Sequence, residues 1–347
     1  MSGTLRFDGS VAIVTGAGGY PGLGRSYAML LAERGAQVVV NDVGFEKAGR
    51  GSSDNARAET TARDIVQAGG AAVADLHSVA DPDGATALVQ TAIDNFGRLD
   101  IVVNNAGVSI SDDFDKLSEA DIRLMVDVNL YGPTWVGRAA WPHLKRSPAG
   151  RMVNVTSGAF LGMPGNVHYG AAKAAVVGLT RGLAAEAAPL GIRVNCVAPA
   201  AGSRMSEAMR DDRPEYVSMI DQSSKLVAPL VAYLAHPVCQ VTGETFEAGF
   251  GAFRRLFISR TKGLADDRYA RALQQFGRGI VARMAGETSE SDKAIAAVAQ
   301  SFEEALADGA PAPSPELICE AMGLICDPDR AATLDAVEAA KLGGAGR

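Results

Sequence analysis

A tyrosine and a lysine stand four positions apart, at Tyr169 and Lys173, where a helical sequence pattern begins. Positions i and i+4 share one face of a helix, so the ammonium group can lie near the phenol. A phenol with a pKa of about 10 is a poor base at neutral pH, and a neighbouring cation lowers that pKa. Two hydroxyl residues, Thr156 and Ser157, end the preceding strand pattern, and either could orient a substrate carbonyl or alcohol. These residues predict acid–base chemistry on an oxygen-bearing carbon.

A glycine-rich turn, TGAGGYPGLGR at 15–25, connects the first strand pattern to a helical one. Such a turn presents backbone N–H groups and the positive end of a helix to a pyrophosphate. Glycine is needed there because a Cβ would block the approach or forbid the backbone angles. We predict that four residues of the turn bind the cofactor: Gly16, Gly22, Leu23 and Gly24.

The second strand pattern ends at Asp42. A carboxylate at this position accepts hydrogen bonds from the adenosine ribose hydroxyl groups and repels a 2′-phosphate. Between Gly16 and Gly24 there is no Lys or Arg to neutralise such a phosphate. The predicted cofactor is therefore NAD rather than NADP.

The elements that position these groups alternate between strands and helices from Ser10 to about Gly251. Short β-branched runs indicate strands at 11–16, 36–42, 71–76, 99–107, 151–157, 192–199 and 244–249. Amphipathic stretches indicate helices at 24–34, 55–68, 84–96, 118–146, 167–188 and 225–235. Most strand runs are apolar throughout, as in a parallel sheet with helices on both faces. We predict an α/β fold with a doubly wound, Rossmann-like parallel sheet of about seven strands.

The remaining residues, 264–347, differ in composition. They are rich in alanine and carry nearly all of the net charge of −7. Ser-Pro at 314–315 and Asp-Pro at 327–328 each pair an N-cap residue with proline at the first helical position. The sequence predicts a dinucleotide-binding catalytic domain at 1–263 and a helical C-terminal extension at 264–347.

Composition excludes several classes of protein. The 347 residues are 47% hydrophobic and 21% charged, which is typical of a globular protein with a sizeable core. The acidic balance argues against nucleic-acid or anionic-membrane partners. No signal-peptide pattern or run of 18 apolar residues occurs, so we expect a cytoplasmic protein. The four cysteines and four histidines show no ligand spacing, so neither a disulfide framework nor a metal site is expected.

Other residues bear on the substrate. Four basic residues could bind the phosphates of a coenzyme A ester, or form a solvated face paired with acids of the C-terminal extension: Arg254, Arg255, Arg260 and Lys262. A further group suits an adaptable apolar pocket or core packing: Met205, Met209, Tyr216 and Met219. His168 adjoins Tyr169 and could reach a substrate, although a structural role is the stronger interpretation.

Together these motifs resemble the short-chain dehydrogenase/reductase family over about residues 7–263. The resemblance is carried by the glycine turn, NNAG (104–107), VNL (128–130), Ser157, the Tyr-x-x-x-Lys pair and the segment around Pro199. Some stretches are most similar to the (3R)-hydroxyacyl-CoA dehydrogenase units of multifunctional enzymes, also described as 17β-hydroxysteroid dehydrogenases. These are VVVNDVG (38–44), the glycine-rich connection at 45–55, APAAGSRM (198–205) and FEAGFGAFRRL (246–256).

The resemblance implies a role for each matching residue. Tyr169 would be the general acid/base, Lys173 would lower its pKa and bind the nicotinamide ribose, and Ser157 would orient the substrate oxygen. Asn129 would hold a water molecule in a proton relay. Further cofactor contacts are implied for Ser78, Asn105, Ala106, Gly107 and Pro199. Aligning the strand selects Ser157 as the orienting hydroxyl, whereas gapless counting selects Thr156.

The sequence thus predicts an NAD-dependent oxidoreductase that transfers a hydride between a bulky secondary alcohol or ketone and nicotinamide, preferably with a 3-hydroxyacyl-CoA. The alternative is a dehydrogenase of hydroxysteroids or other large alcohols, aryl alcohols included, that does not use CoA esters. A catalytically silent NAD-binding regulator is a third hypothesis. The expected partners are a small molecule with a bulky apolar part and further copies of the chain, in a homodimer or homotetramer.

Overall fold

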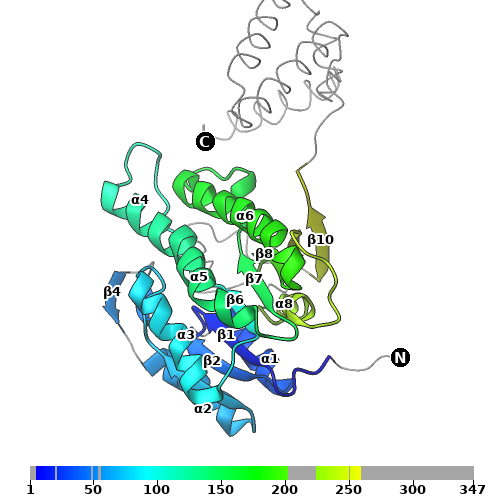
Figure 1. Cartoon of the computed structure of the whole chain (residues 1–347). Helices are drawn as coiled ribbons and strands as arrows, with labels where there is room; N and C mark the ends of the chain where they lie inside the picture. Colours follow the sequence, from blue (N-terminus) through cyan, green and yellow to red (C-terminus); the bar gives the residue numbers. More distant parts are fainter. Residues whose placement is uncertain are drawn as a thin grey trace, which may run out of the picture. The chain divides into compact units, whose positions relative to one another are not determined.

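The computed structural model describes residues 5–19, 22–47, 50–53, 56–201, 224–249 and 251–258 (Figure 1). The chain divides into two compact units, Met1–Phe257 and Ile258–Arg347. The predicted helices of 264–347 lie outside the described residues, and so do six candidate substrate residues: Met205, Met209, Tyr216, Met219, Arg260 and Lys262. Within the described part of the chain, no helix is long and apolar enough to cross a bilayer.

Eight strands form one sheet in the order β10-β9-β8-β7-β6-β1-β2-β5. They are β1 (Val11–Thr15), β2 (Gln37–Asn41), β5 (Ala71–Asp75), β6 (Ile101–Asn104), β7 (Arg151–Val155), β8 (Arg193–Ala200), β9 (Thr245–Gly249) and β10 (Ala252–Leu256). Only β9 and β10 pair antiparallel; the other neighbours are parallel. The strand order runs outward from β1 in both directions, so the topology switches between β1 and β6. The predicted doubly wound parallel sheet is confirmed.

Two strand features differ from the expectation. β10 was not predicted, because its residues are exposed or half-buried and lack the apolar run of a buried strand. Residues 45–55 were interpreted as a connection, which is wrong. β3 (Phe45–Lys47) and β4 (Arg50–Ser53) pair there as a two-stranded antiparallel sheet. Strands of three or four residues are too short for a period of two to be legible.

Helices cover both faces of the sheet (Figure 1). They are α1 (Leu23–Glu33), α2 (Ala56–Gln67), α3 (Pro82–Phe96), α4 (Glu119–Val126), α5 (Gly132–Leu144), α6 (Val167–Ala187) and α8 (Ala228–Ala235). Residues of α1, α2 and α8 share one core with Ala12 and Val14, whereas α3, α5 and α6 share another with Val11 and Ile13. Successive side chains of a strand face opposite sides, so β1 contributes to both cores. Two-sided burial is why the strand runs are apolar throughout.

The predicted helix at 118–146 consists of two helices. A π-helical turn, Asp127–Tyr131, joins α4 to α5. Ser118 caps α4 by accepting a hydrogen bond from the backbone N–H of Asp121. Single π turns inside α-helices often mark functional sites, and this one carries Asn129.

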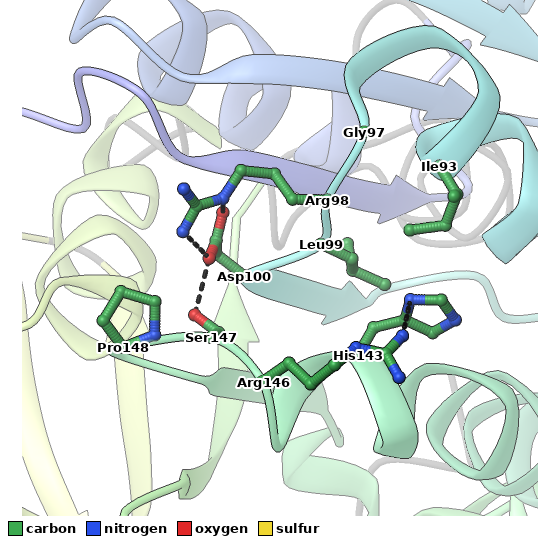
Figure 2. A pocket seen from close by; sticks show the side chains of 9 residues that line it. All are labelled: Ile93, Gly97, Arg98, Leu99, Asp100, His143, Arg146, Ser147 and Pro148. Carbon is green, nitrogen blue, oxygen red and sulfur yellow. Dashed lines mark hydrogen bonds and ion pairs between the residues drawn. The ribbon is translucent and has the colours of Figure 1, made fainter.

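At the edge of the sheet where the parallel strands begin, called the amino edge below, polar contacts gather around Asp100 (Figure 2). Its carboxylate accepts hydrogen bonds from the Arg98 guanidinium at 2.8 and 2.7 Å, the Val11 N–H at 2.9 Å and the Ser147 hydroxyl at 2.5 Å. Since α3 and α5 both end at this edge, cationic side chains here also meet the negative ends of two helix dipoles. Arg98, Asp100 and Ser147 line a pocket of about 320 Å³.

Candidate active site

The glycine-rich turn leaves β1 at the topological switch point and enters α1. Gly16 has a φ of +63°, a conformation that favours glycine. A Cβ at Gly24 would lie 2.4 Å from the Gly16 carbonyl oxygen, and one at Gly22 would lie 2.2 Å from that of Gly19. Gly22 is the N-cap of α1 and has no side chain to occupy the helix N–H groups that begin at Leu23. The turn therefore fits a pyrophosphate cradle.

Asn105 and Ala106 fasten this turn to the end of β6. Their backbone N–H groups both donate to the Thr15 hydroxyl at 3.0 Å. The Asn105 side-chain amide donates to the carbonyl oxygens of Thr15 at 2.9 Å and Gly16 at 3.1 Å. The Asn105 amide and the backbone N–H groups of Asn105 and Ala106 are thus all used to fix the cradle, and the cofactor contacts of Asn105, Ala106 and Gly107 stay a prediction.

Asp42 follows β2 and ties the end of that strand to the glycine turn. Its carboxylate accepts hydrogen bonds from the backbone N–H groups of Gly18 at 2.9 Å and Gly44 at 2.8 Å. The start of α2 packs on the same turn, because a Cβ at Gly18 would lie 2.8 Å from the Ala58 nitrogen. Each carboxylate oxygen keeps a further acceptor position for ribose hydroxyl groups. Both carboxylate oxygens are therefore held in place, and the contact of Asp42 with the cofactor ribose stays a prediction.

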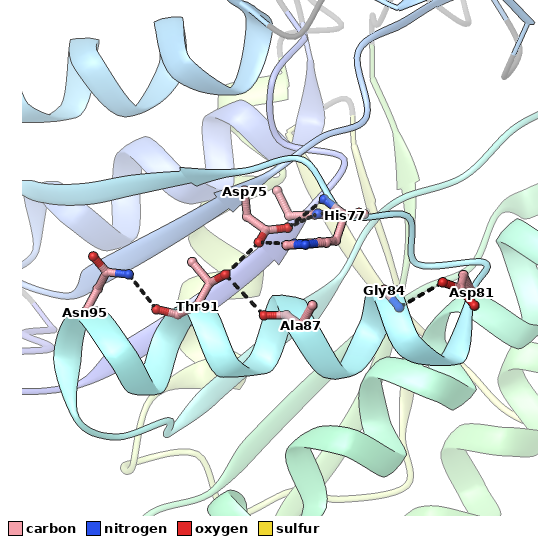
Figure 3. A network of polar contacts seen from close by, with 8 residues as sticks. Asp75, His77, Asp81, Gly84, Ala87, Thr91 and Asn95 are labelled. Atoms are coloured by element: carbon pink, nitrogen blue, oxygen red, sulfur yellow. Dashed lines mark hydrogen bonds and ion pairs between the residues drawn. The ribbon is translucent and has the colours of Figure 1, made fainter.

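The end of β5 carries a network that the sequence reasoning missed (Figure 3). The buried Asp75 carboxylate accepts hydrogen bonds from Asn41 Nδ2 at 2.8 Å, His77 Nδ1 at 2.9 Å and Thr91 Oγ1 at 2.8 Å. The predicted cofactor residue Ser78 follows; it is exposed, and its hydroxyl accepts a backbone N–H two residues on. The available signal was an aspartate at the end of a strand pattern, two positions before a histidine.

Thr156 and Ser157 lie in different surroundings after β7. Thr156 is 1% exposed, and its hydroxyl donates to the Lys173 carbonyl oxygen at 2.6 Å. Ser157 is half-buried, accepts the Ala159 N–H at 3.2 Å and is hydrogen-bonded to Tyr169. The geometry favours Ser157 as the orienting hydroxyl, because the Thr156 hydroxyl is already used to fasten α6 to the sheet.

Tyr169 and Lys173 are both buried in the first turns of α6. Lys173 Nζ donates to the Val155 carbonyl oxygen at 2.9 Å and lies 5.8 Å from the centroid of the Tyr169 ring. Burial lowers the pKa of Lys173 to about 8. Burial also raises the pKa of Tyr169, and the hydrogen bond with Ser157 opposes that rise. The structure brings the pair together, but in the protein alone burial dominates, so the net shift of the phenol pKa is upward rather than downward.

Asn129 is 1% exposed, and both hydrogens of its side-chain amide are used in hydrogen bonds. Its amide donates to the carbonyl oxygens of Val108 at 2.7 Å and Met125 at 2.8 Å. A Cβ at Gly107 would lie 2.8 Å from Asn129 Oδ1 and 3.3 Å from Lys173 Nζ, so glycine lets both groups approach the turn. A water molecule at Asn129 would have to donate to Oδ1 or to a backbone carbonyl, and the relay stays a prediction.

Exposed apolar side chains flank the start of α6. Phe114, on the β6–α4 connection, is 66% exposed. On the β7–α6 connection and the first residue of α6, Leu161, Met163 and Val167 are 66%, 45% and 48% exposed. A backbone hydrogen bond of 3.1 Å joins the two connections, and the His168 ring stacks on Phe114 with centroids 5.3 Å apart. We call these four apolar residues the apolar rim.

Arg254 and Arg255 do not form one basic cluster. They are neighbours on β10, so their side chains project from opposite faces of the sheet. Arg254 forms an ion pair with Glu247 at 3.0 Å, and Arg255 forms a two-point pair with Glu244 at 2.7 Å. The arrangement supports a solvated face, but its acidic partners are Glu244 and Glu247, and the expected pairing with acids of the C-terminal extension lies outside the described residues.

The predicted site residues meet at the carboxyl edge of the sheet, on either side of the switch point. Pro199 is at this edge too, half-buried and in register with Ala248 of β9. Across the described ranges, no group of three or more His, Cys, Asp or Glu side chains is placed to hold a metal ion. The edge combines a glycine turn that fits an anion, the acid predicted to bind the ribose, and a hydroxyl–phenol–ammonium group.

Comparison with known proteins accounts for this combination. The short chain dehydrogenase family model matches residues 10–214. The chain belongs to the short chain dehydrogenase family. It is therefore an oxidoreductase, and the family typically uses a nicotinamide cofactor.

Three proteins similar to this short chain dehydrogenase are informative. The peroxisomal multifunctional enzyme type 2 of Drosophila melanogaster is 44% identical over 262 residues, which cover 75% of this chain and 42% of that protein. This chain thus spans less than half of that relative. Subunit BbsD of the (2S)-[(R)-hydroxy(phenyl)methyl]succinyl-CoA dehydrogenase of Thauera aromatica is 43% identical over 205 residues, covering 59% of this chain and 77% of that one. The crystal structure of carveol dehydrogenase from Mycobacterium avium in complex with NAD has a TM-score of 0.64 and 28% identity, covering 70% of this chain and 97% of that chain.

Proposed function

We propose that this protein is an NAD-dependent dehydrogenase that transfers a hydride between a bulky secondary alcohol, or its ketone, and nicotinamide, preferably with a 3-hydroxyacyl-CoA. The observation that carries the proposal is the placement of Ser157, Tyr169 and Lys173 beside the glycine cradle. Pure binding of a dinucleotide needs no buried phenol hydrogen-bonded to a serine. Such a pair is what proton transfer to a substrate oxygen requires.

The choice of NAD rests on Asp42. Its carboxylate follows β2 and is fixed by two backbone N–H groups. An acid at this point of a dinucleotide-binding fold bonds the ribose hydroxyl groups and repels a 2′-phosphate. The NAD complex of the carveol dehydrogenase relative supports the same choice. When bound, the dinucleotide supplies the carbon that accepts or gives the hydride.

Residues of this chain transfer the proton of the substrate hydroxyl group. The Ser157 hydroxyl orients the substrate oxygen, and Tyr169 removes its proton during oxidation or returns it during reduction. Lys173 lies one helical turn away, and below its pKa of about 8 it holds a positive charge that stabilises the phenolate. Oxidation needs the ionised phenol, so its rate should rise with pH toward the raised pKa of Tyr169. Reduction needs the protonated form and should fall over the same range.

The apolar rim supports a substrate with a bulky apolar part, since adjacent exposed apolar side chains commonly mark a binding surface. A CoA ester is supported by the Thauera aromatica relative, whose name specifies a hydroxylated, phenyl-bearing CoA thioester. The alternative, a large alcohol without CoA, is favoured by the carveol dehydrogenase relative. It is also favoured by the ion pairs that occupy Arg254 and Arg255.

A screen for NADH formation tests the proposal. The purified full chain is assayed with 3-hydroxyacyl-CoAs, the matching N-acetylcysteamine thioesters, hydroxysteroids and aryl alcohols, each with NAD and with NADP. We expect turnover with NAD and a clear preference for the CoA esters. Equal turnover of the short thioesters would remove the CoA requirement and leave the alternative. If none of these alcohols were oxidised with either cofactor, the proposed dehydrogenase activity would be wrong.

The same preparation tests the predicted assembly. We propose a homodimer or homotetramer, and light scattering of the full chain gives the solution mass directly. A monomer at assay concentration would contradict it.

A further inference from the structure

Phe114 is an exposed aromatic ring that is already covered on one face. It lies on the β6–α4 connection and is 66% exposed. The His168 ring stacks on it, with the centroids 5.3 Å apart and the two planes at 17°. Because a near-parallel stack covers one face of the phenyl ring, the exposed surface belongs to the other face and the edge. The open face offers a place for a further ring.

The connection that carries Phe114 packs against Tyr169 near both of its ends. Val108 near its start shares a buried cluster with Tyr169, and Ile110 and Leu117 pack against that cluster. The stacking partner His168 directly precedes Tyr169 in α6. The exposed ring therefore lies beside the turn of α6 that carries the phenol.

Hydrogen bonds hold this connection in place. Asn166 is 5% exposed, and its Oδ1 accepts hydrogen bonds from Ser109 Oγ at 3.1 Å and Ser111 Oγ at 3.0 Å. Although asparagine at an N-cap commonly bonds the helix N–H groups, this one does not, and its side chain serves the connection instead. The Asp112 N–H also donates to the Gly165 carbonyl oxygen at 3.1 Å. The exposed ring is thus positioned before any ligand arrives, which reduces the entropy cost of using it.

Phe114 differs in kind from the rest of the apolar rim. The other members, Leu161, Met163 and Val167, are aliphatic, and burial of aliphatic surface has no directional preference. An aromatic face favours another flat ring, because a stacked pair gains attraction beyond the area that it buries. The aliphatic members of the rim fit bulk alone, whereas Phe114 adds a preference for shape.

We propose that Phe114 selects substrates that carry an aromatic ring, which stacks on the face of Phe114 opposite His168. The inference rests on the proposed function, because it requires an alcohol whose reacting oxygen lies at Ser157 and Tyr169. It narrows the bulky apolar part of that substrate to a flat ring and makes Phe114 a specificity-determining residue. A ring attached through methylene groups is bound equally in the ground state and the transition state, so stacking should lower KM and leave kcat unchanged.

The experiment compares substrates that differ only in their ring. Each carries a phenyl or a cyclohexyl ring, separated from the carbinol carbon by one, two or three methylene groups so that the ring does not alter the reactivity of the alcohol. The compounds are assayed with NAD both as 3-hydroxyacyl-CoAs and as free secondary alcohols. The two rings bury similar apolar area, but only phenyl is flat. With the spacer that reaches Phe114, we expect the kcat/KM of the wild type to be about fivefold higher for phenyl, with the difference in KM.

Three variants locate the preference. Phe114→Leu keeps an apolar side chain without a ring, so it should lose about fivefold in kcat/KM for the phenyl substrate and change little for the cyclohexyl one. Phe114→Tyr keeps the flat ring and should keep the wild-type ratio. Leu161→Ala is the matched control, because Leu161 is equally exposed on the same rim and has no ring. It should affect both substrates alike.

A phenyl to cyclohexyl ratio near one for every spacer, or a ratio that persists in Phe114→Leu, would overturn the assignment. Loss of the ratio in Leu161→Ala would also overturn it, because the whole rim would then make the selection. A lower solution mass of Phe114→Leu in light scattering, with both substrates affected alike, would place the ring in a contact between copies instead. In each of these cases the proposed dehydrogenase stands, since both rings still yield NADH. If the wild type oxidises neither series, the proposed function is wrong and the selection by Phe114 is wrong with it.

Discussion

The two edges of the sheet both contain charged groups, and the Asp100–Arg98 pair at the amino edge differs from the Tyr169–Lys173 pair at the carboxyl edge. Arg151, also at the amino edge, is buried among carbonyl oxygens as Lys173 is, so the contrast concerns these two pairs rather than every charge at each edge. At the amino edge, Asp100 pairs with Arg98, and this hydrogen-bonded contact raises the pKa of the guanidinium. At the carboxyl edge, Lys173 is buried against a neutral carbonyl oxygen, and burial lowers its pKa to about 8. Tyr169 is buried beside it with a raised pKa.

The difference separates groups that stabilise the fold from groups that serve the chemistry. A paired charge holds strand ends together and keeps its ordinary protonation state. A buried charge with only neutral partners costs stability, and such groups are concentrated at functional sites. The amino edge should therefore respond to mutation in stability, and the carboxyl edge in activity.

Tyr169→Phe should have the largest effect on activity. The variant keeps the ring but removes the group that exchanges the proton, so kcat/KM should fall by about 10³-fold. Steady-state kinetics with the best substrate from the screen measures the change, and urea unfolding checks that the fold is intact. Activity within tenfold of the wild type would place the acid–base group elsewhere and undo the contrast between the edges.

Ser157→Ala should come next. Losing a hydrogen-bonding group that orients the reacting oxygen costs about 10²-fold in kcat. Thr156→Val is the matched control, because the Thr156 hydroxyl bonds the Lys173 carbonyl oxygen and no substrate. It should lower the free energy of unfolding by about 1 kcal/mol and leave kcat within a few-fold. If Thr156→Val instead lost about 10²-fold in kcat while Ser157→Ala kept its activity, Thr156 would be the orienting residue.

Asp100→Ala tests the amino edge. It leaves the buried N–H of Val11 without its acceptor and Arg98 without its ion pair, so the free energy of unfolding should fall by about 2 kcal/mol. Urea unfolding measures this loss, while kcat per folded molecule should be unchanged. A large drop in kcat at constant stability would show that the two edges are coupled.

The pattern of residues predicted the features that depend on local spacing. Continuous apolar runs such as β1 are buried on both faces, and the four-residue spacing placed Tyr169 and Lys173 on one helix face. Features that depend on distant segments were not predictable. Asp75 accepts hydrogen bonds from residues of β2 and α3, and Thr156 differs from Ser157 by its deeper burial and by its bond to a carbonyl oxygen 17 positions away.

Sequence proximity also misled at two points. Arg254 and Arg255 looked like one basic cluster, but adjacent residues of a strand project to opposite faces, and β10 was not recognised as a strand. The shift of the phenol pKa was expected from Lys173 alone. Its direction is set by burial under the connections that follow β6 and β7, which no local pattern reveals.

Lys173→Met sharpens the comparison through pH. The pKa of Lys173 falls from an ordinary 10.5 to about 8 in the folded protein, so the unfolded chain binds more protons between these values. Wild-type stability therefore gains from this residue as the pH rises through that window, by up to about 3 kcal/mol, and burying the charge costs that much below pH 8. The variant removes this cost but leaves the Val155 carbonyl oxygen unpaired, which offsets about 1–2 kcal/mol. At pH 7 the variant should be more stable than the wild type by about 1 kcal/mol while losing activity, and this advantage should disappear by about pH 10.

Urea unfolding of both proteins across this range measures the difference in their free energies of unfolding. An advantage of Lys173→Met that stays constant with pH would show that Lys173 is not buried as a charge, and that the two edges differ less than their contacts suggest.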